Sequence, residues 1–105
     1  MPLRGSGMTK KILAPHDSTK APHGYVYVLG SLRGADRRTY VGWCVDLEQR
    51  LAAHNSGRGA RSTRGRAWVL LYAERFVTRR EAMSREVSLK RDRKFRAQLA
   101  KALAL

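Results

Sequence analysis

The chain has 105 residues, enough for one modest hydrophobic core, and its 22 basic against 8 acidic residues give a formal net charge of +14. Its single cysteine, Cys44, excludes an intrachain disulfide and a cysteine-based zinc site. No apolar run approaches the roughly 18 residues of a membrane helix, so we expect a cytoplasmic protein with no membrane partner and no disulfide partner. The positive excess favours nucleic acid as partner, because each neutralised phosphate releases condensed counterions.

Residues 1–23 combine Pro2, Pro15 and Pro22 with glycine and small polar residues, and they show no periodicity. This composition predicts a flexible basic N-terminal extension, and we expect the folded domain at residues 24–105. The extension is interpreted either as a plain tail or as a basic arm that follows a phosphate backbone.

Two short runs rich in β-branched and aromatic residues, 25–31 and 39–44, flank a connection rich in glycine and charge. Such a pattern predicts two strands of one hairpin. Tyr25 and Tyr27 then project from the same face, since side chains alternate along a strand. Gly42, inside the second strand, predicts a close approach of another backbone or of a ligand.

A helix is expected directly after the hairpin, over residues 46–55. Asp46 can cap its N-terminus, and Gln49 stands three residues later in a capping-box position. Arg50 and His54 are four residues apart, so they are neighbours beside the apolar stripe of this helix. An arginine and a histidine are thereby brought close to the tyrosines of the hairpin.

The segment 56–66 contains three glycines, four arginines and no acidic residue. Glycine allows a backbone to press close to a ligand, and guanidinium groups fork onto phosphate oxygens. The alternative is a flexible, solvated loop. Because nothing in the segment balances its charge, we predict a phosphate-binding loop, with contacts from Arg58, Arg61, Arg64 and Arg66.

The remaining chain predicts one strand and two helices. The nearly continuous apolar run at 68–76 is typical of a strand buried on both faces. Thr78 and Glu81 form a capping box for a helix to about residue 91, and an amphipathic segment follows at 93–103. The first of these helices has the apolar residues Ala82, Met83, Val87 and Leu89. The order is β-β-α-β-α-α, an α+β fold with a small three-stranded sheet packed against helices.

These residues, in this order, resemble the GIY-YIG nuclease domain over residues 24–99. The two strand motifs of that family are seen here as Tyr25-Val26-Tyr27 and Tyr40-Val41-Gly42. Small stand-alone members of the superfamily share two further patterns, seen as His54-Asn55-Ser56-Gly57-Arg58-Gly59-Ala60 with the following Thr63-Arg64, and as the segment from Ala82 to Lys90.

The resemblance implies a divalent-metal-dependent endonuclease that uses Mg²⁺ or Mn²⁺ and acts on DNA or structured nucleic acid, with DNA favoured. By position, the catalytic residues of the family correspond to Tyr27, Tyr40, Arg50, His54 and Glu86, and Gly42 is the second-motif glycine. Glu86 is the implied metal ligand, and Lys90 joins the loop arginines as an expected nucleic-acid contact.

The division of labour among these residues stays open at this point. The resemblance implies that either Tyr27 or Tyr40 activates the water, and Arg50 and the metal are expected to lower the pKa of that tyrosine from its usual value of about 10. His54 is expected to orient the tyrosine, to take its proton or to contact the scissile phosphate.

Two positions depart from the family pattern. Tyr25 stands where the first motif has glycine, and no asparagine follows Glu86, although larger members of the family carry one. The missing asparagine leaves a second hypothesis, a nucleic-acid-binding module on the same fold with little or no catalysis.

Overall fold

A three-stranded antiparallel sheet organises the computed structural model, which describes residues 24–104; the extension expected at 1–23 lies outside the described residues. Strand β1 (Gly24–Arg33) is its central strand, with β2 (Asp36–Cys44) on one side and β3 (Val69–Phe76) on the other. Because both neighbours pair with β1, its first eight residues are buried. The turn between β1 and β2 contains Gly34 at φ +61°, a conformation that glycine adopts without strain.

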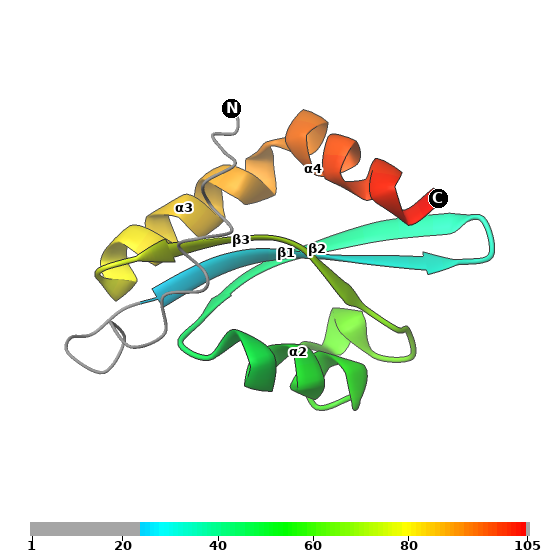
Figure 1. The fold of residues 1–105 in the computed structure, drawn as a ribbon, viewed down its shortest axis with the longest axis horizontal. Helices are drawn as coiled ribbons and strands as arrows, with labels where there is room; N and C mark the ends of the chain where they lie inside the picture. The colour runs from blue at the N-terminus through cyan, green and yellow to red at the C-terminus, as the bar shows by residue number, and fades with distance from the viewer. Residues whose placement is uncertain (1–23, 105) are drawn as a thin grey trace.

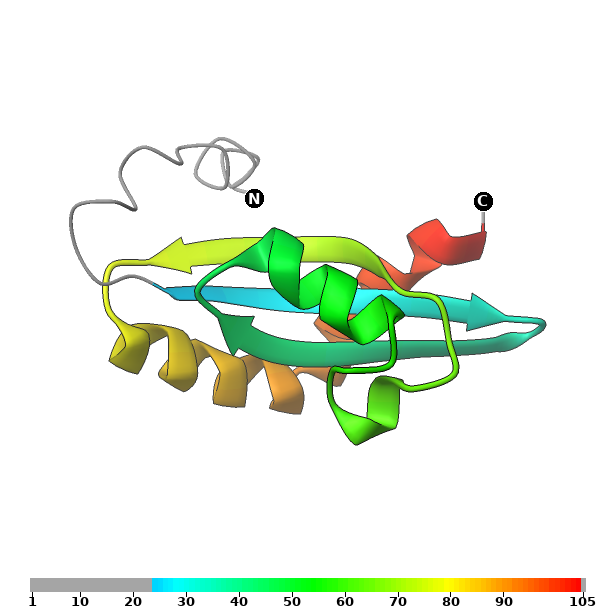
Figure 2. The same cartoon turned by 90° about the horizontal axis from the view of Figure 1, so that it is seen from below.

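The helices form a layer on each face of the sheet (Figures 1 and 2). Helix α2 (Leu47–Asn55) covers one face, and helices α3 (Arg79–Arg91) and α4 (Arg93–Ala100) cover the other. Two short 3₁₀ turns complete the order, η3 (Arg61–Thr63) and η4 (Lys101–Ala104). The predicted α+β fold and its element order are confirmed.

Alternation along β1 divides the apolar side chains between two small cores. Tyr25, Tyr27 and Leu29 face α2, whereas Val26 and Val28 face α3 and α4. Trp68 and Ala73 also belong to the first core, and Ala82 and Leu89 belong to the second.

The two predicted capping boxes begin helices at the expected positions. The Asp46 carboxylate accepts a hydrogen bond of 3.1 Å from the backbone N–H of Gln49. The Thr78 hydroxyl accepts one of 3.2 Å from the N–H of Glu81. These caps fix where α2 and α3 start, and therefore where Arg50 and Glu86 stand along them.

One expectation about burial is wrong. Strand β3 is an edge strand rather than one buried on both faces, and Val69 and Leu70 near its start are 51% and 39% exposed. Met83 and Val87 are 47% and 48% exposed, because α3 packs through Ala82 and Leu89. A helix turns by about 100° per residue, which places Met83 and Val87 well away from that narrow packing face.

Among the helices of residues 24–104, none combines the length and the apolar character that crossing a membrane requires.

Candidate active site

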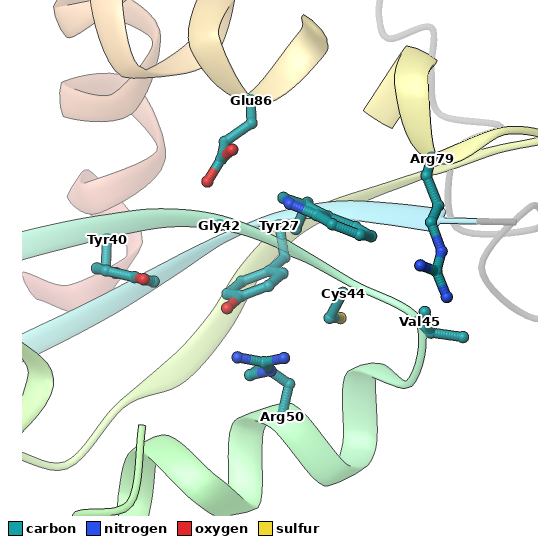
Figure 3. Close-up of a pocket in the computed structure, with 9 residues that line it drawn as sticks. Tyr27, Tyr40, Gly42, Cys44, Val45, Arg50, Arg79 and Glu86 are labelled. Carbon is teal, nitrogen blue, oxygen red and sulfur yellow. The ribbon is translucent and has the colours of Figure 1, made fainter. Parts of the chain in front are cut away.

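A cleft of about 320 Å³ opens at the outer edge of strand β2 (Figure 3). It brings together four of the predicted catalytic residues, Tyr27, Tyr40, Arg50 and Glu86. Its other lining residues are Gly42, Trp43, Cys44, Val45 and Arg79. The volume is in the range of ligand sites, and the lining is rich in polar groups.

The cleft joins residues from opposite faces of the sheet. Arg50 is on α2 and Glu86 is on α3, and these helices cover different faces. The two side chains approach each other because β2 has no neighbouring strand on its outer side within the described sheet. Figure 3 shows Glu86 on one side of β2, Arg50 on the other, and the ring of Tyr27 between them.

Gly42 allows Tyr27 to reach this edge. The two residues are cross-strand partners, Tyr27 on β1 and Gly42 on β2. A Cβ atom at Gly42 would lie 2.5 Å from the Tyr27 hydroxyl oxygen and 2.7 Å from the ring carbon that carries it. The close approach expected at this glycine is therefore made by a tyrosine side chain.

His54 lies behind the tyrosines and does not line the cleft. It is 1% exposed, and its Nε2 is 2.9 Å from the Tyr27 hydroxyl oxygen. The rings of Tyr40 and His54 are 4.9 Å apart between centroids. His54 is thus placed to exchange a proton with Tyr27, but not to contact a phosphate directly.

Gly59 makes room for this histidine. A Cβ atom at Gly59 would collide with His54 Nδ1 and would lie 2.9 Å from the His54 Cα. The second glycine of the His-Asn-x-Gly-x-Gly-Ala pattern is therefore needed for packing against His54.

Burial determines the protonation of the two hydrogen-bonded groups. It raises the pKa of Tyr27 well above the usual range, with smaller contributions from Tyr40 and Cys44, whereas Arg50 lowers that pKa. The expected lowering by Arg50 is present, but in the protein alone burial outweighs it. Burial, followed by Arg50, lowers the pKa of His54. The resting pair is therefore a neutral phenol and a neutral imidazole.

Cys44 is a buried thiol in the cleft wall. It is 3% exposed, and burial raises its pKa to about 11. A thiol in this state is a weak nucleophile, so its part in the cleft is to fill space.

Glu86 fits a magnesium ion held mainly by water and substrate. Its side chain is 19% exposed and its carboxylate is 3.4 Å from the Lys90 ammonium. No group of three His, Cys, Asp or Glu able to hold a metal occurs within residues 24–104, which disfavours a structural zinc site. Mg²⁺ commonly binds through one or two carboxylates and keeps several waters.

The arginine-rich segment is anchored at both ends. Asn55 Oδ1 accepts a hydrogen bond of 2.6 Å from the N–H of Trp68, and Asn55 Nδ2 donates one of 3.0 Å to the Trp68 carbonyl. The loop between these residues therefore closes on itself, and three of its four arginines, Arg58, Arg61 and Arg64, are exposed. This arrangement differs from an unanchored, solvated loop.

Arg66 is not free to contact phosphate. Its side chain is 4% exposed and its Nη1 is 2.9 Å from Asp36 Oδ2. Its Nε donates a hydrogen bond of 3.0 Å to the Ser31 hydroxyl. Arg66 thus ties the loop to the β1–β2 hairpin, and its balancing charge comes from outside the segment.

Sequence reasoning did not single out Arg79 or Thr63 as site residues. Arg79 lines the cleft, and its guanidinium lies 5.9 Å from the centroid of the Trp43 ring. Its separation of seven residues from Glu86 places both on one face of α3, a signal that the sequence does contain. Thr63 is linked to Tyr27 through His54, and that link depends on the folded loop.

Comparison with known proteins places this geometry in a family. The GIY-YIG catalytic domain matches residues 23–99. A UPF0213 protein of Streptococcus pneumoniae is 46% identical over 71 residues, covering 67% of this chain and 69% of the relative. A UPF0213 protein of Clostridium perfringens is 48% identical over 68 residues, covering 64% and 70%. One of Natronomonas pharaonis is 45% identical over 67 residues, covering 63% and 75%.

No solved structure matches the chain. The domain match nevertheless spans most of the residues that form the sheet, the helices and the cleft. The chain therefore belongs to the GIY-YIG catalytic domain family.

Proposed function

We propose that this protein is a divalent-metal-dependent endonuclease that hydrolyses phosphodiester bonds in DNA or structured nucleic acid. The observation that carries the proposal is the convergence of Tyr27, Arg50 and Glu86 on one cleft from three different elements. Membership of the GIY-YIG catalytic domain family supports nuclease chemistry. The positive excess of the chain supports a polyanionic substrate.

The presence of two arginines in the cleft supports binding of a phosphate substrate. Arg50 can hold two non-bridging oxygens of the scissile phosphate at once, since its guanidinium is a planar fork. Arg79 lines the same cleft beside Trp43 and is placed to take a neighbouring phosphate. Their two positive charges exceed the single negative charge of Glu86, so the cleft is suited to an anion.

Tyr27 is the better candidate for the water activator. Its hydroxyl is hydrogen bonded to His54, whereas the Tyr40 hydroxyl has no hydrogen-bond partner among residues 24–104. In the proposed step Tyr27 gives its proton to His54 Nε2 and takes one from the attacking water. The water oxygen bonds to phosphorus as the bond to the leaving oxygen breaks. Because burial opposes a free phenolate, the two proton transfers belong to one concerted event.

Glu86 would hold the divalent ion, Mg²⁺ or Mn²⁺, that GIY-YIG domains typically use. When bound, this ion would act as a Lewis acid and stabilise negative charge on the phosphate and the leaving oxygen.

The test is cleavage of labelled duplex, nicked, branched and single-stranded DNA by the full chain, with Mg²⁺ or Mn²⁺ and with chelator. We expect Glu86→Gln, Arg50→Lys and Tyr27→Phe to reduce cleavage by at least about 10²-fold. Glu81→Gln is the matched control, because Glu81 is an exposed carboxylate on the same helix. Equal cleavage by the wild type and all variants would indicate a contaminant and end the proposal.

The second candidate is a binding module with little catalysis. It is favoured because no asparagine stands between Glu86 and Leu105, and Asn55 itself is committed to Trp68. Binding would then fall steeply with salt and would not respond to Mg²⁺. For either activity we propose a cytoplasmic location, where a buried thiol such as Cys44 stays reduced.

A further inference from the structure

We propose that Thr63 is a positioning residue of the nuclease site: its hydroxyl determines which nitrogen of His54 carries the proton, and so leaves Nε2 able to accept the proton of Tyr27. The inference rests on the proposed function for its catalytic meaning. Its structural content, the tautomer of His54, stands on hydrogen-bond geometry alone.

A chain of three buried or partly buried hydrogen bonds runs from the cleft into the loop. The Tyr27 hydroxyl is 2.9 Å from His54 Nε2, and His54 Nδ1 is 2.9 Å from Thr63 Oγ1. Thr63 Oγ1 donates a hydrogen bond of 2.8 Å to the carbonyl oxygen of Ala60. Thr63 is 0% exposed, so water cannot replace any of these partners at its hydroxyl.

The direction of each bond follows from the number of hydrogens. The Ala60 carbonyl can only accept, so the single hydroxyl hydrogen of Thr63 points at it. Thr63 Oγ1 then faces His54 with a lone pair, and Nδ1 must be the protonated nitrogen that donates to it. In a neutral imidazole the other nitrogen, Nε2, is then an acceptor, and Tyr27 donates to it.

The reversed arrangement fails at Thr63. If Thr63 donated to His54 Nδ1, the oxygens of Thr63 and Ala60 would face each other at 2.8 Å without a hydrogen between them. Thr63 is fully buried, so no water could separate the two oxygens.

The loop holds Thr63 firmly in this role. The Thr63 carbonyl accepts a hydrogen bond of 2.8 Å from the indole N–H of Trp68. The backbone N–H of Thr63 donates to the same Ala60 carbonyl at 3.0 Å. Asn55 pairs with Trp68 and closes the loop, and Gly59 leaves room for the histidine ring. The exposed arginines and the proton acceptor are thus supported by one folded segment.

For the reaction, this tautomer allows the proton to move from the Tyr27 hydroxyl to His54 Nε2. The O–H bond of Tyr27 breaks and an N–H bond forms at His54 Nε2, while Nδ1–H stays bonded to Thr63. With the opposite tautomer Nε2 would already carry a hydrogen, and Tyr27 could not give up its proton.

The first test is nuclear magnetic resonance of the ¹⁵N-labelled full chain, without substrate or metal. Two-bond ¹⁵N–¹H correlations report which ring nitrogen is protonated, and His54→Gln identifies the His54 signals. We expect a neutral imidazole with Nδ1 protonated and Nε2 unprotonated. Finding the proton on Nε2 in the wild type would overturn the inference, whether or not any variant folds.

The second test compares Thr63→Val, which keeps the shape and loses the hydroxyl, with Thr63→Ser, which keeps the hydroxyl. We expect Thr63→Val to lose the tautomer preference and to reduce kcat about 10²-fold with little change in KM, and Thr63→Ser to restore both. Equal kcat for wild type and a folded Thr63→Val would refute the positioning role of Thr63 while leaving the proposed nuclease activity intact. A wild type that shows the expected tautomer yet cuts nothing would refute the nuclease while leaving the tautomer assignment.

Discussion

At Gly42 the missing side chain leaves the space that the Tyr27 hydroxyl occupies. Gly42→Ala would push a methyl group into the space of the Tyr27 hydroxyl and ring. We expect cleavage to fall at least about 10²-fold, and unfolding to become easier by about 1–3 kcal/mol through overpacking. Cleavage rates and urea denaturation of the same preparation measure the two effects.

Gly30→Ala is the control for that variant. A methyl group at Gly30 would also clash, but with the flexible ends of Leu71 and Leu103, outside the cleft. We therefore expect a loss of stability without a matching loss of cleavage. If both alanine variants lost cleavage in proportion to stability, the special position of Gly42 would be refuted.

His54 should make both cleavage and stability depend on pH. The groups that face it are Tyr27 on β1, Tyr40 on β2 and Arg50 on its own helix, and burial with Arg50 lowers its pKa below 6.5. The folded protein therefore prefers neutral His54. The stabilisation is present above pH 6.5 and is lost as pH falls through the lowered pKa. Cleavage should decline in the same acidic window, because only neutral His54 accepts a proton.

Urea denaturation at pH 7.5 and at pH 5 checks whether the protein loses stability as the pH falls. The free energy of unfolding should fall more for the wild type than for His54→Gln, which has no ring to protonate. An identical pH dependence in the two proteins would mean that His54 is not buried in its neutral form.

At the scale of elements, the loop from Asn55 to Trp68 should bind phosphates through its exposed arginines. We expect replacement of Arg58, Arg61 and Arg64 by alanine to weaken DNA binding and to flatten its salt dependence. The slope of log K against log salt should decrease by about 0.9 for each phosphate that the variant no longer neutralises. Fluorescence anisotropy over a range of salt concentrations measures both.

Two controls separate direct phosphate binding from net charge. Replacement of Arg91, Arg93 and Lys101 by alanine removes the same charge as the triple loop variant, but outside the loop. It should leave most of the slope of log K against log salt unchanged. Arg66→Ala should destabilise the protein, because Asp36 and Ser31 lose a buried partner, and should not change the slope. A triple loop variant with the wild-type slope would exclude the loop as a phosphate-binding segment.

The first turn of α3 offers a matched pair of arginines. Arg79 lines the cleft and Arg80, its neighbour, does not. Arg79→Ala should weaken DNA binding in chelator about tenfold, because it removes one charge-assisted hydrogen bond to phosphate, and Arg80→Ala should change it little. Equal effects of the two substitutions would show that only net charge matters here.

Much of the fold could be predicted from local patterns. The capping pairs at Asp46 and Thr78 and the alternation around Tyr25 and Tyr27 are properties of neighbouring residues, and the elements begin and alternate accordingly. Strand order is not local. Because nothing in the run at 68–76 indicates that β1 takes the central place, the burial expected for β3 was too high.

In the candidate site, too, some residues could be predicted from the sequence and others depend on contacts that only the folded chain makes. Tyr27, Tyr40, Arg50 and Glu86 were expected from the motif resemblance, and the structure brings them to one cleft. The burial of Arg66 could not be expected, because its partner Asp36 lies 30 residues earlier in the chain. The link from His54 to Thr63 likewise exists only once the loop has closed.

For the molecule as a whole, the cleft depends on both layers keeping their places on the sheet. Leu89 is fully buried and anchors α3, which carries Glu86. Leu89→Ala should cost about 2–5 kcal/mol of unfolding free energy and should also reduce cleavage under conditions where the variant is still folded. Circular dichroism and cleavage rates at low temperature measure the two effects, and unchanged cleavage by a folded variant would contradict this coupling.

The position of the cleft at the outer side of β2 also limits how this protein can assemble. An unpaired strand usually invites a strand from another chain, but a segment that paired alongside Gly42 would lie across Tyr27 and fill the space between Arg50 and Glu86. Such a partner would block the cleft and keep substrate out of it. Peptides that add a strand at this border are accordingly the natural form for an inhibitor.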